Sequence, residues 1–170
     1  MVREHLDRVY NLALRLTGNQ ADAWDLAQES MIKAVRALPS FRGEAGLGTW
    51  LFRITVNAWK NRVESSSFRW WSRLSPLGGG QGLDEDHPRA PEPAAPDPLP
   101  DQVLERGEDS EAVHRALGKL DPVERAILVL REIEDRSYEE IATIMGIPVG
   151  TVKSRLHRAR SALARELEGL

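Results

Sequence analysis

The sequence predicts an all-α chain of two small helical domains joined by a linker. Three observations support this fold class. Apolar residues recur at helical spacing in two separated parts of the chain, and capping or stop residues bound each helical segment. Seven of the ten prolines fall between residues 76 and 101, where Gly78–Gly80 and Gly82 also lie. We therefore expect domains at 1–75 and 110–170, joined by a Pro/Gly-rich acidic linker at 76–109.

Three helices are expected in the N-terminal domain. The first has a periodic apolar face and ends at Gly18, and the second begins at Asp22 and stops at Pro39. A glycine-rich loop, 41–48, precedes a third helix that Thr49 caps and that runs to about Glu64. The apolar residues expected to face the core are Leu6, Val9, Tyr10, Ala13 and Leu16 in the first helix, and Trp24, Ala27, Met31, Val35 and Leu38 in the second.

The C-terminal domain has the pattern of a helix-turn-helix. Asp121–Pro122–Val123–Glu124 and Ser137–Tyr138–Glu139–Glu140 each have the form of a capping box that opens a helix. Small Ala142 allows two helices to approach, Gly146 permits the left-handed turn between them, and Val152 packs the second helix on the first. A last helix follows Pro148, with an apolar stripe through Val149, Val152, Leu156, Ala159 and Leu163.

Composition excludes several classes of protein. The 170 residues contain no cysteine, which excludes a disulfide scaffold, a Cys-ligated zinc site and a thiol nucleophile. The four histidines are scattered, and no nucleophile, base or carboxylate pair is organised for catalysis, so we expect no metal, no cofactor, no small-molecule substrate and no enzymatic activity. No apolar run approaches the ~18–20 residues that cross a bilayer, and the start of the chain lacks the apolar core of a signal peptide, so a cytoplasmic protein without membrane insertion is expected.

The net charge of −3 conceals a strong pattern along the chain. Residues 31–75 have a net charge of +6 and residues 150–170 a net charge of +3, while residues 76–113 between them have −8. The whole-chain value is therefore a poor guide to partners, because two basic segments are separated by an acidic one.

The helix after Pro148 opposes its apolar stripe with a donor-rich face. A recognition helix needs this combination in order to pack on its domain and enter the major groove of DNA. The alternative is a helical hairpin with a solvated basic face, but capping, glycine position and charge asymmetry together favour DNA binding. The residues of this face are Thr151, Lys153, Ser154, Arg155, His157, Arg158 and Arg160.

Two further patterns have open interpretations when taken from the residues alone. The third helix has a narrow polar stripe, Arg53, Asn57, Lys60 and Glu64, close to basic and aromatic residues, which suits single-stranded nucleic acid but suits an ordinary core helix slightly better. On the second helix Asp22, Asp25 and Glu29 share a face, which fits either a solvated surface with a Glu29–Lys33 pair or a docking patch for a basic partner.

Strings within both domains resemble bacterial sigma factors of the extracytoplasmic-function (ECF) group. Asp25–Glu29, Phe41–Glu44, Thr49–Ile54 and Val56–Asn57 resemble region 2 of that family. Leu120–Pro122, Tyr138–Ala142 and Gly150–Arg160 resemble region 4. The region 4 strings also suit response-regulator DNA-binding domains, so region 2 in front of them makes the resemblance specific.

The resemblance implies a role for each candidate residue. Asp22, Asp25, Gln28 and Glu29 would bind the coiled coil of the largest polymerase subunit, and the helix that follows Asp121 would dock on the polymerase flap. Phe41 and Asn57 match base-pocket positions for the −10 element, beside Arg42 in the loop, and Arg53 and Lys60 would meet phosphate. In the −35 element, Lys153, Ser154, His157 and Arg158 would face bases, and Thr151, Arg155 and Arg160 would lie nearer phosphate.

The implied function is promoter-specific initiation of transcription together with core RNA polymerase. The implied partners are core RNA polymerase, promoter DNA and an anti-sigma factor. A stand-alone helix-turn-helix regulator that binds DNA without polymerase is the main alternative, and a protein-interaction module is a third. Departures from the family pattern include Trp24, where an acidic residue is common, and His157, where an aromatic is common.

Overall fold

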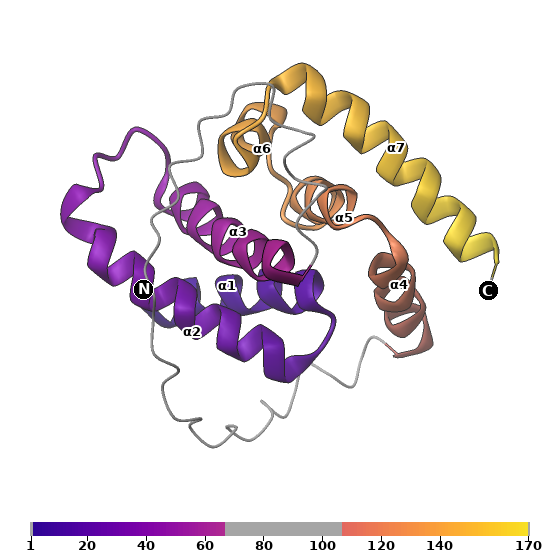
Figure 1. Ribbon diagram of the computed structural model, residues 1–170, viewed down its shortest axis with the longest axis horizontal. Helices are drawn as coiled ribbons and strands as arrows, with labels where there is room; N and C mark the ends of the chain where they lie inside the picture. Colours follow the sequence, from indigo (N-terminus) through magenta and orange to yellow (C-terminus); the bar gives the residue numbers. More distant parts are fainter. Residues whose placement is uncertain (1, 67–106, 170) are drawn as a thin grey trace.

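The computed structural model describes residues 2–66 and 107–169, and every regular element in these two ranges is helical, as the sequence predicts (Figure 1). Most of the expected linker and the pair Trp70–Trp71 lie outside the described residues. The first domain consists of α1 (Val2–Thr17), α2 (Gln20–Ala37), the short η1 (Leu38–Ser40) and α3 (Leu47–Ser66). The second consists of α4 (Gly107–Lys119), α5 (Pro122–Leu128), η3 (Val129–Ile133), α6 (Tyr138–Met145) and α7 (Val149–Glu168).

Two helix starts in the first domain differ from the prediction. α2 begins two residues before Asp22, because the Asn19 side chain accepts a hydrogen bond of 2.8 Å from the Asp22 amide and so provides the N-cap. α3 begins at Leu47, and Thr49 is a buried residue of its first turn rather than its cap. The stop at Gly18 is confirmed, with a φ of +81° that glycine adopts without strain.

The caps of the second domain largely follow the prediction. Asp121 caps α5, but its carboxylate accepts from the Val123 amide at 3.0 Å instead of from Glu124. Ser137 and Glu140 form the full capping box at the start of α6, and Gly146 ends that helix at a φ of +67°. The buried stripe of α7 is Val152, Leu156 and Ala159, so the helix-turn-helix geometry is confirmed.

The connection from α5 to α6 is irregular. In η3, the Glu134 amide donates to the Val129 carbonyl at 3.0 Å, which is the wider hydrogen-bonding pattern of a π-helical turn. Asp135 then takes a φ of +52°, a left-handed conformation that is uncommon for a residue other than glycine. This turn directs the following residue, Arg136, toward the first domain.

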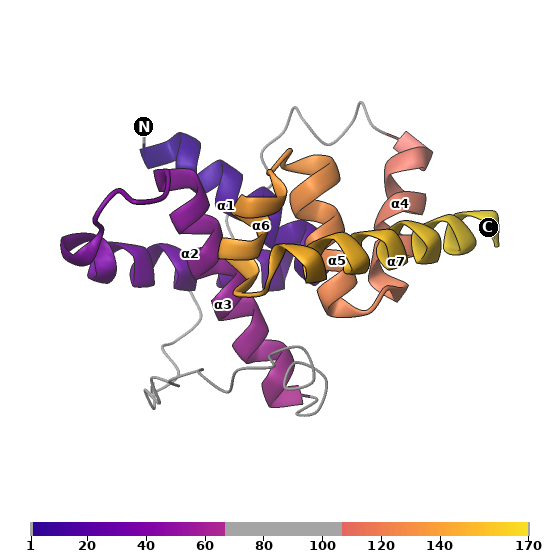
Figure 2. The same ribbon diagram turned by 90° about the horizontal axis from the view of Figure 1, so that it is seen from above.

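The two domains share one hydrophobic core and pack directly on each other. α3 lies against α6, and α1 contacts α4, α5 and η3, while α7 covers the far side of the second domain (Figures 1 and 2). The sequence predicts two domains on a linker and does not predict this closed packing.

The apolar face of α2 is only partly buried, which corrects the sequence prediction for its last turns. Val35 is 68% exposed and Leu38 is 53% exposed, although both continue the face of buried Ala27. α2 extends past the helices that cover its first half (Figure 2), so Val35 and Leu38 stay exposed, although Ala34, next to Val35, is still buried.

Candidate nucleic-acid interface

The exposed face of α7 gathers the residues expected to contact the −35 element. Lys153, Ser154, His157 and Arg158 are exposed, and Thr151 and Arg155 are half-buried beside them. Because the opposite stripe of α7 packs on α5 and α6, this donor-rich face is held outward on a rigid helix.

Arg160 differs from the other members of this face. Its guanidinium donates to the Glu132 carboxylate, with the Nε–Oε1 hydrogen bond at 2.7 Å. The guanidinium is therefore already paired with a residue of its own domain. Lys153 is also oriented by a neighbour, since its ammonium lies 5.8 Å from the centre of the Tyr138 ring. A phosphate contact by Arg160 therefore requires it to leave or share Glu132.

A second candidate surface lies on the loop before α3 and on the exposed stripe of that helix. Arg53 and Asn57 are exposed and Lys60 is half-buried, so these three members of the polar stripe predicted from the sequence reach solvent, while the side chain of Glu64 lies outside the described ones. Arg42, in the loop, is exposed as well. Arg53, Asn57 and Lys60 recur at helical spacing along one edge of α3, as a surface that follows a nucleic-acid strand requires.

Phe41 packs against Trp50, with ring centroids 4.8 Å apart and planes tilted by 43°. Both residues are half-buried, so the pair offers a partly accessible aromatic surface beside the polar stripe. The sequence pattern places Trp50 only in the apolar part of α3. Its position directly after Thr49 gives no sign that it reaches the loop.

The acidic face of α2 is the third candidate surface. Asp22 and Asp25 are exposed, and Gln28 and Glu29 are half-buried. Asp22 also accepts a hydrogen bond of 2.6 Å from the Asn19 side chain, which holds its carboxylate at the start of the helix.

Glu29 is already paired within the domain. Both Nε and Nη2 of Arg62 donate to one of its oxygens, at 3.0 and 2.7 Å, and Lys33 lies 2.8 Å from the other. Burial alone would raise the pKa of Glu29, but the hydrogen bonds and charges of Lys33 and Arg62 bring its pKa below the ordinary value. The sequence predicts the pair with Lys33, whereas the contact with Arg62 joins α2 to α3.

An exposed apolar patch adjoins this acidic face. Ile32 is 54% exposed, and it lies four residues after Gln28 and seven after Asp25, on the same side of the helix. Met31, Ile32, Val35 and Arg36 line a shallow hollow of about 310 Å³. The sequence pattern conceals this patch, because helical spacing alone places Met31 and Val35 in the core.

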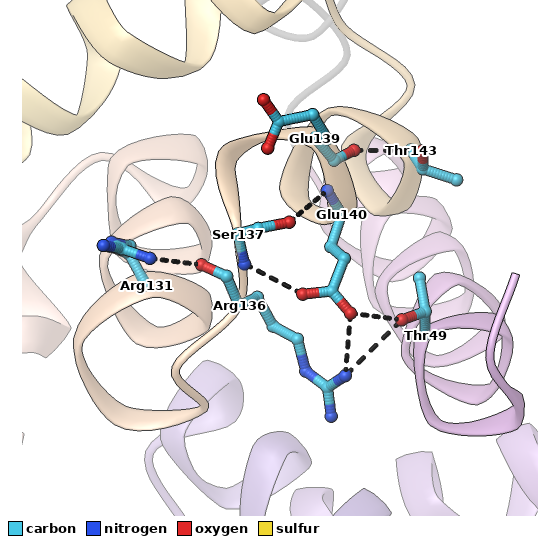
Figure 3. Close-up of polar contacts among 7 residues, drawn as sticks. All are labelled: Thr49, Arg131, Arg136, Ser137, Glu139, Glu140 and Thr143. Atoms are coloured by element: carbon cyan, nitrogen blue, oxygen red, sulfur yellow. Dashed lines mark hydrogen bonds and ion pairs between the residues drawn. The ribbon is translucent and has the colours of Figure 1, made fainter.

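A polar cluster lies where the two domains meet (Figure 3). One oxygen of Glu140 accepts from the Ser137 amide at 2.9 Å, and the other accepts from the Thr49 hydroxyl of α3 at 3.0 Å. The Arg136 guanidinium donates to this second oxygen at 3.2 Å. The Ser137 amide, and then Thr49 and Arg136, keep the pKa of Glu140 below its ordinary value.

Metal-binding clusters and membrane-spanning helices are both lacking in the part of the chain that the structure describes. No group of three or more acidic or histidine side chains there could hold a metal ion. None of the helices in 2–66 and 107–169 is both long and apolar enough to cross a membrane.

Comparison with protein families supports two regions in this order. Residues 1–69 match the model described as Sigma-70 region 2, and residues 110–163 match the model described as Sigma-70, region 4.

Three curated proteins are similar over nearly the whole chain. The chain is 41% identical over 163 residues to the ECF RNA polymerase sigma factor SigE of Mycolicibacterium smegmatis, covering 96% of this chain but 58% of that protein. It is 36% identical to the RNA polymerase sigma-H factor of Pseudomonas aeruginosa, covering 100% of this chain and 86% of the other. For the ECF RNA polymerase sigma factor SigW of Bacillus subtilis, the identity is 34%, with coverage of 96% and 85%.

Two solved structures resemble the whole arrangement. The sigma factor RpoE, in complex with the anti-sigma factor NepR from Bartonella quintana, aligns with a TM-score of 0.69 at 25% identity, covering 98% of this chain and 94% of that one. CnrH, in complex with the cytosolic domain of CnrY, aligns with a TM-score of 0.65 at 25% identity, covering 99% and 85%.

Proposed function

Because the chain belongs to the extracytoplasmic-function sigma factors of RNA polymerase, we propose that it binds core RNA polymerase and directs it to promoters with matching −10 and −35 elements. The observation that most favours this function is the presence of two separate candidate DNA surfaces in one chain. One is the donor-rich face of α7, and the other combines the Phe41–Trp50 pair with the exposed stripe of α3. A regulator that binds only duplex DNA has no need of the second.

In this proposal α7 enters the major groove of the −35 element. Lys153, Ser154, His157 and Arg158 contact base edges, because they occupy the exposed side of a helix whose other side is packed. Thr151 and Arg155 position the helix on phosphate, and Arg160 does so after exchanging Glu132 for a phosphate oxygen.

The loop and α3 would act on the −10 element after local strand separation. A base that leaves the stack loses a few kcal/mol of stacking and pairing free energy. Stacking on an aromatic side chain and hydrogen bonds to the edge of the base must offset this loss. Phe41, supported by Trp50, provides the aromatic surface, and Asn57 provides donor and acceptor groups. Arg42, Arg53 and Lys60 neutralise the phosphates of the displaced strand.

The polymerase surface would comprise the acidic face of α2 and the apolar patch beside it. Asp22, Asp25 and Gln28 offer acceptors to the coiled coil of the largest subunit, and Ile32 and Val35 offer apolar area to the same partner. Glu29 contributes less directly, because Arg62 and Lys33 already occupy both of its oxygens. The N-terminal end of α5, after Asp121, is the proposed contact for the polymerase flap.

Three further aspects belong to the same proposal. Domain boundaries at 1–75 and 110–170 enclose the two matched regions, with 76–109 as the linker, although α4 already begins at Gly107. The chain performs no catalysis itself, needs no cofactor or small-molecule substrate, and acts in the cytoplasm, where polymerase and promoter are. An anti-sigma factor would regulate it, since two similar solved structures are complexes, one of them with a named anti-sigma factor.

Transcription in vitro tests the function directly. Full-length protein is mixed with bacterial core RNA polymerase and a promoter library, and the transcribed templates are sequenced. A sigma factor co-elutes with the core enzyme and enriches templates that share two spaced elements. A protein that binds duplex DNA tightly, but neither co-elutes with polymerase nor starts transcription, would instead be the stand-alone regulator.

A further inference from the structure

The contact between the two domains is specific. Four residues, which we call the interdomain cluster, join them: Thr49 and Phe52 of α3, and Arg136 and Glu140 of the second domain (Figure 3 shows the polar members). Thr49 donates to Glu140 at 3.0 Å, and Arg136 donates to Thr49 at 3.4 Å. The Arg136 guanidinium also lies 4.8 Å from the centre of the Phe52 ring.

Arg136 is largely covered by this contact. Its side chain is only 13% exposed, and Phe52 is 1% exposed. A cation over an aromatic ring gains most where water is excluded, so the closed packing gives Arg136 a site that separated domains could not provide.

A second anchor lies at the other end of the interface. Arg125 of α5 donates to the Leu16 carbonyl of α1 at 2.8 Å, and to the Gly118 carbonyl of its own domain at the same distance. It therefore joins the last turn of α1 to the junction between α4 and α5.

The closed packing brings together two surfaces that polymerase would need separately. A cleft of about 340 Å³ has Asp22, Trp59 and Arg62 of the first domain on one side, and Pro122 and Arg125 of α5 on the other. Asp22 belongs to the proposed coiled-coil surface, and Pro122 begins the proposed flap helix. Two polymerase elements cannot both enter a space of this size, which would hold only a few side chains.

The closed packing also places the two DNA surfaces too close together. α3 contacts α6, which contacts α7, and packed helices lie ~8–10 Å apart. With ~1.5 Å per residue along each helix, the polar stripe of α3 and the exposed face of α7 lie within about 50 Å. Elements about 25 base pairs apart are separated by ~85 Å along DNA at ~3.4 Å per pair.

We propose that the closed packing is an autoinhibited resting state of the free chain, held by Arg136 and the interdomain cluster. This inference rests on the proposed function, since polymerase is the partner that the closed state excludes. Opening separates the cleft, frees α5 and lets the domains take the spacing of a promoter. The chain itself then supplies part of the inhibition, before any other protein binds.

Distance measurements on the full chain test this proposal. The chain has no cysteine, so Asp7→Cys and Ala164→Cys, both at exposed helical positions in different domains, provide two unique spin-label sites. Pulsed electron-electron double resonance then measures the fractions of closed and open molecules. Arg136→Ala should raise the open-to-closed ratio roughly tenfold, and Thr49→Val, which keeps side-chain volume, should raise it roughly threefold. Exposed Arg165→Ala serves as the matched arginine control.

Binding to core RNA polymerase is measured with the same variants. If only the open form binds, the apparent affinity for polymerase rises in proportion to the fraction of open molecules. Arg136→Ala should therefore bind up to roughly tenfold more tightly than wild type. Circular dichroism confirms that helix content is retained, and Thr49→Val provides the test should Arg136→Ala unfold.

Three results would overturn the inference in distinguishable ways. Unchanged distances in a folded variant would show that the cluster does not hold the domains together. Open molecules that bind polymerase no better than wild type would show that closure does not inhibit. If no form binds polymerase, the proposed function itself fails, and the resting-state inference fails with it.

Discussion

The exposed apolar patch on α2 gives a direct test of polymerase docking through Val35→Ser. Fully burying a valine side chain contributes ~1.5–3 kcal/mol. Val35 is 68% exposed in the free protein, so a partner that covers it would gain ~1–2 kcal/mol from that fraction. The variant should therefore bind core RNA polymerase roughly 5–30-fold more weakly.

Folding should be unaffected by the same substitution. Valine and serine have similar helix propensities, and exposed substitutions usually change the free energy of unfolding by less than ~0.5 kcal/mol. Thermal unfolding followed by circular dichroism measures stability, and fluorescence anisotropy of a labelled chain measures affinity for the core enzyme. Leu167→Ser is a matched control, because Leu167 is an exposed apolar residue, 40% accessible, at the far end of α7.

Two results would contradict polymerase docking through this patch. Wild-type affinity in Val35→Ser would show that the patch lies outside the polymerase interface. Equal weakening in Leu167→Ser would show that the assay reports general surface hydrophobicity rather than docking.

Four other substitutions test separate parts of the site. Arg158→Ala should weaken binding to a cognate −35 duplex by ~1–3 kcal/mol in a gel-shift titration, and an equal loss on random DNA would show that it touches only phosphate. Asp25→Arg should abolish co-elution with core polymerase while DNA binding by α7 persists; normal holoenzyme would refute the docking role. Ser137→Ala removes the acceptor for the Glu140 amide and should cost ~1 kcal/mol of unfolding free energy in urea titrations, and an unchanged unfolding midpoint would contradict this role of the cap. The pKa of Glu140 is lowered in the folded state, so its stabilising contribution is complete above the ordinary value of 4.5 and is lost as pH falls below it. Glu140→Gln should remove that part of the acid dependence, and an unchanged pH profile of unfolding would contradict the assignment.

Local chemistry made most of the helix boundaries predictable. Residues that start or stop a helix act through their own backbone or their nearest neighbours, so their effects are visible in a short window of sequence. Here these residues are Gly18, Pro39, Ser137 and Gly146. Asn19 was missed as the cap of α2 because Asp22 is an equally suitable capping residue three positions later.

The candidate surfaces also divide into those that the sequence could predict and those that it could not. The face of α7 was predictable because its donors and its buried stripe lie on one helix. The exposure of Val35 was not, because periodicity identifies an apolar face without showing how far its neighbours extend. The Thr49–Glu140 contact joins residues 91 positions apart, and nothing in either local pattern indicates that they meet. The roles of individual residues in DNA and polymerase binding stay predictions.

The π-helical turn at Val129–Ile133 has a consequence for how such chains can diverge. A π turn holds one residue more than the α-helical turn it replaces, and each residue added to or removed from a helix rotates the downstream segment by about 100°. Deleting a single residue there would turn Arg136 and α6 relative to α5, and because α7 packs on α5, the core of the second domain would have to repack as well. The position of Arg136 over the Phe52 ring therefore depends on the length of this turn, and in our proposal so does the restraint that the chain places on itself.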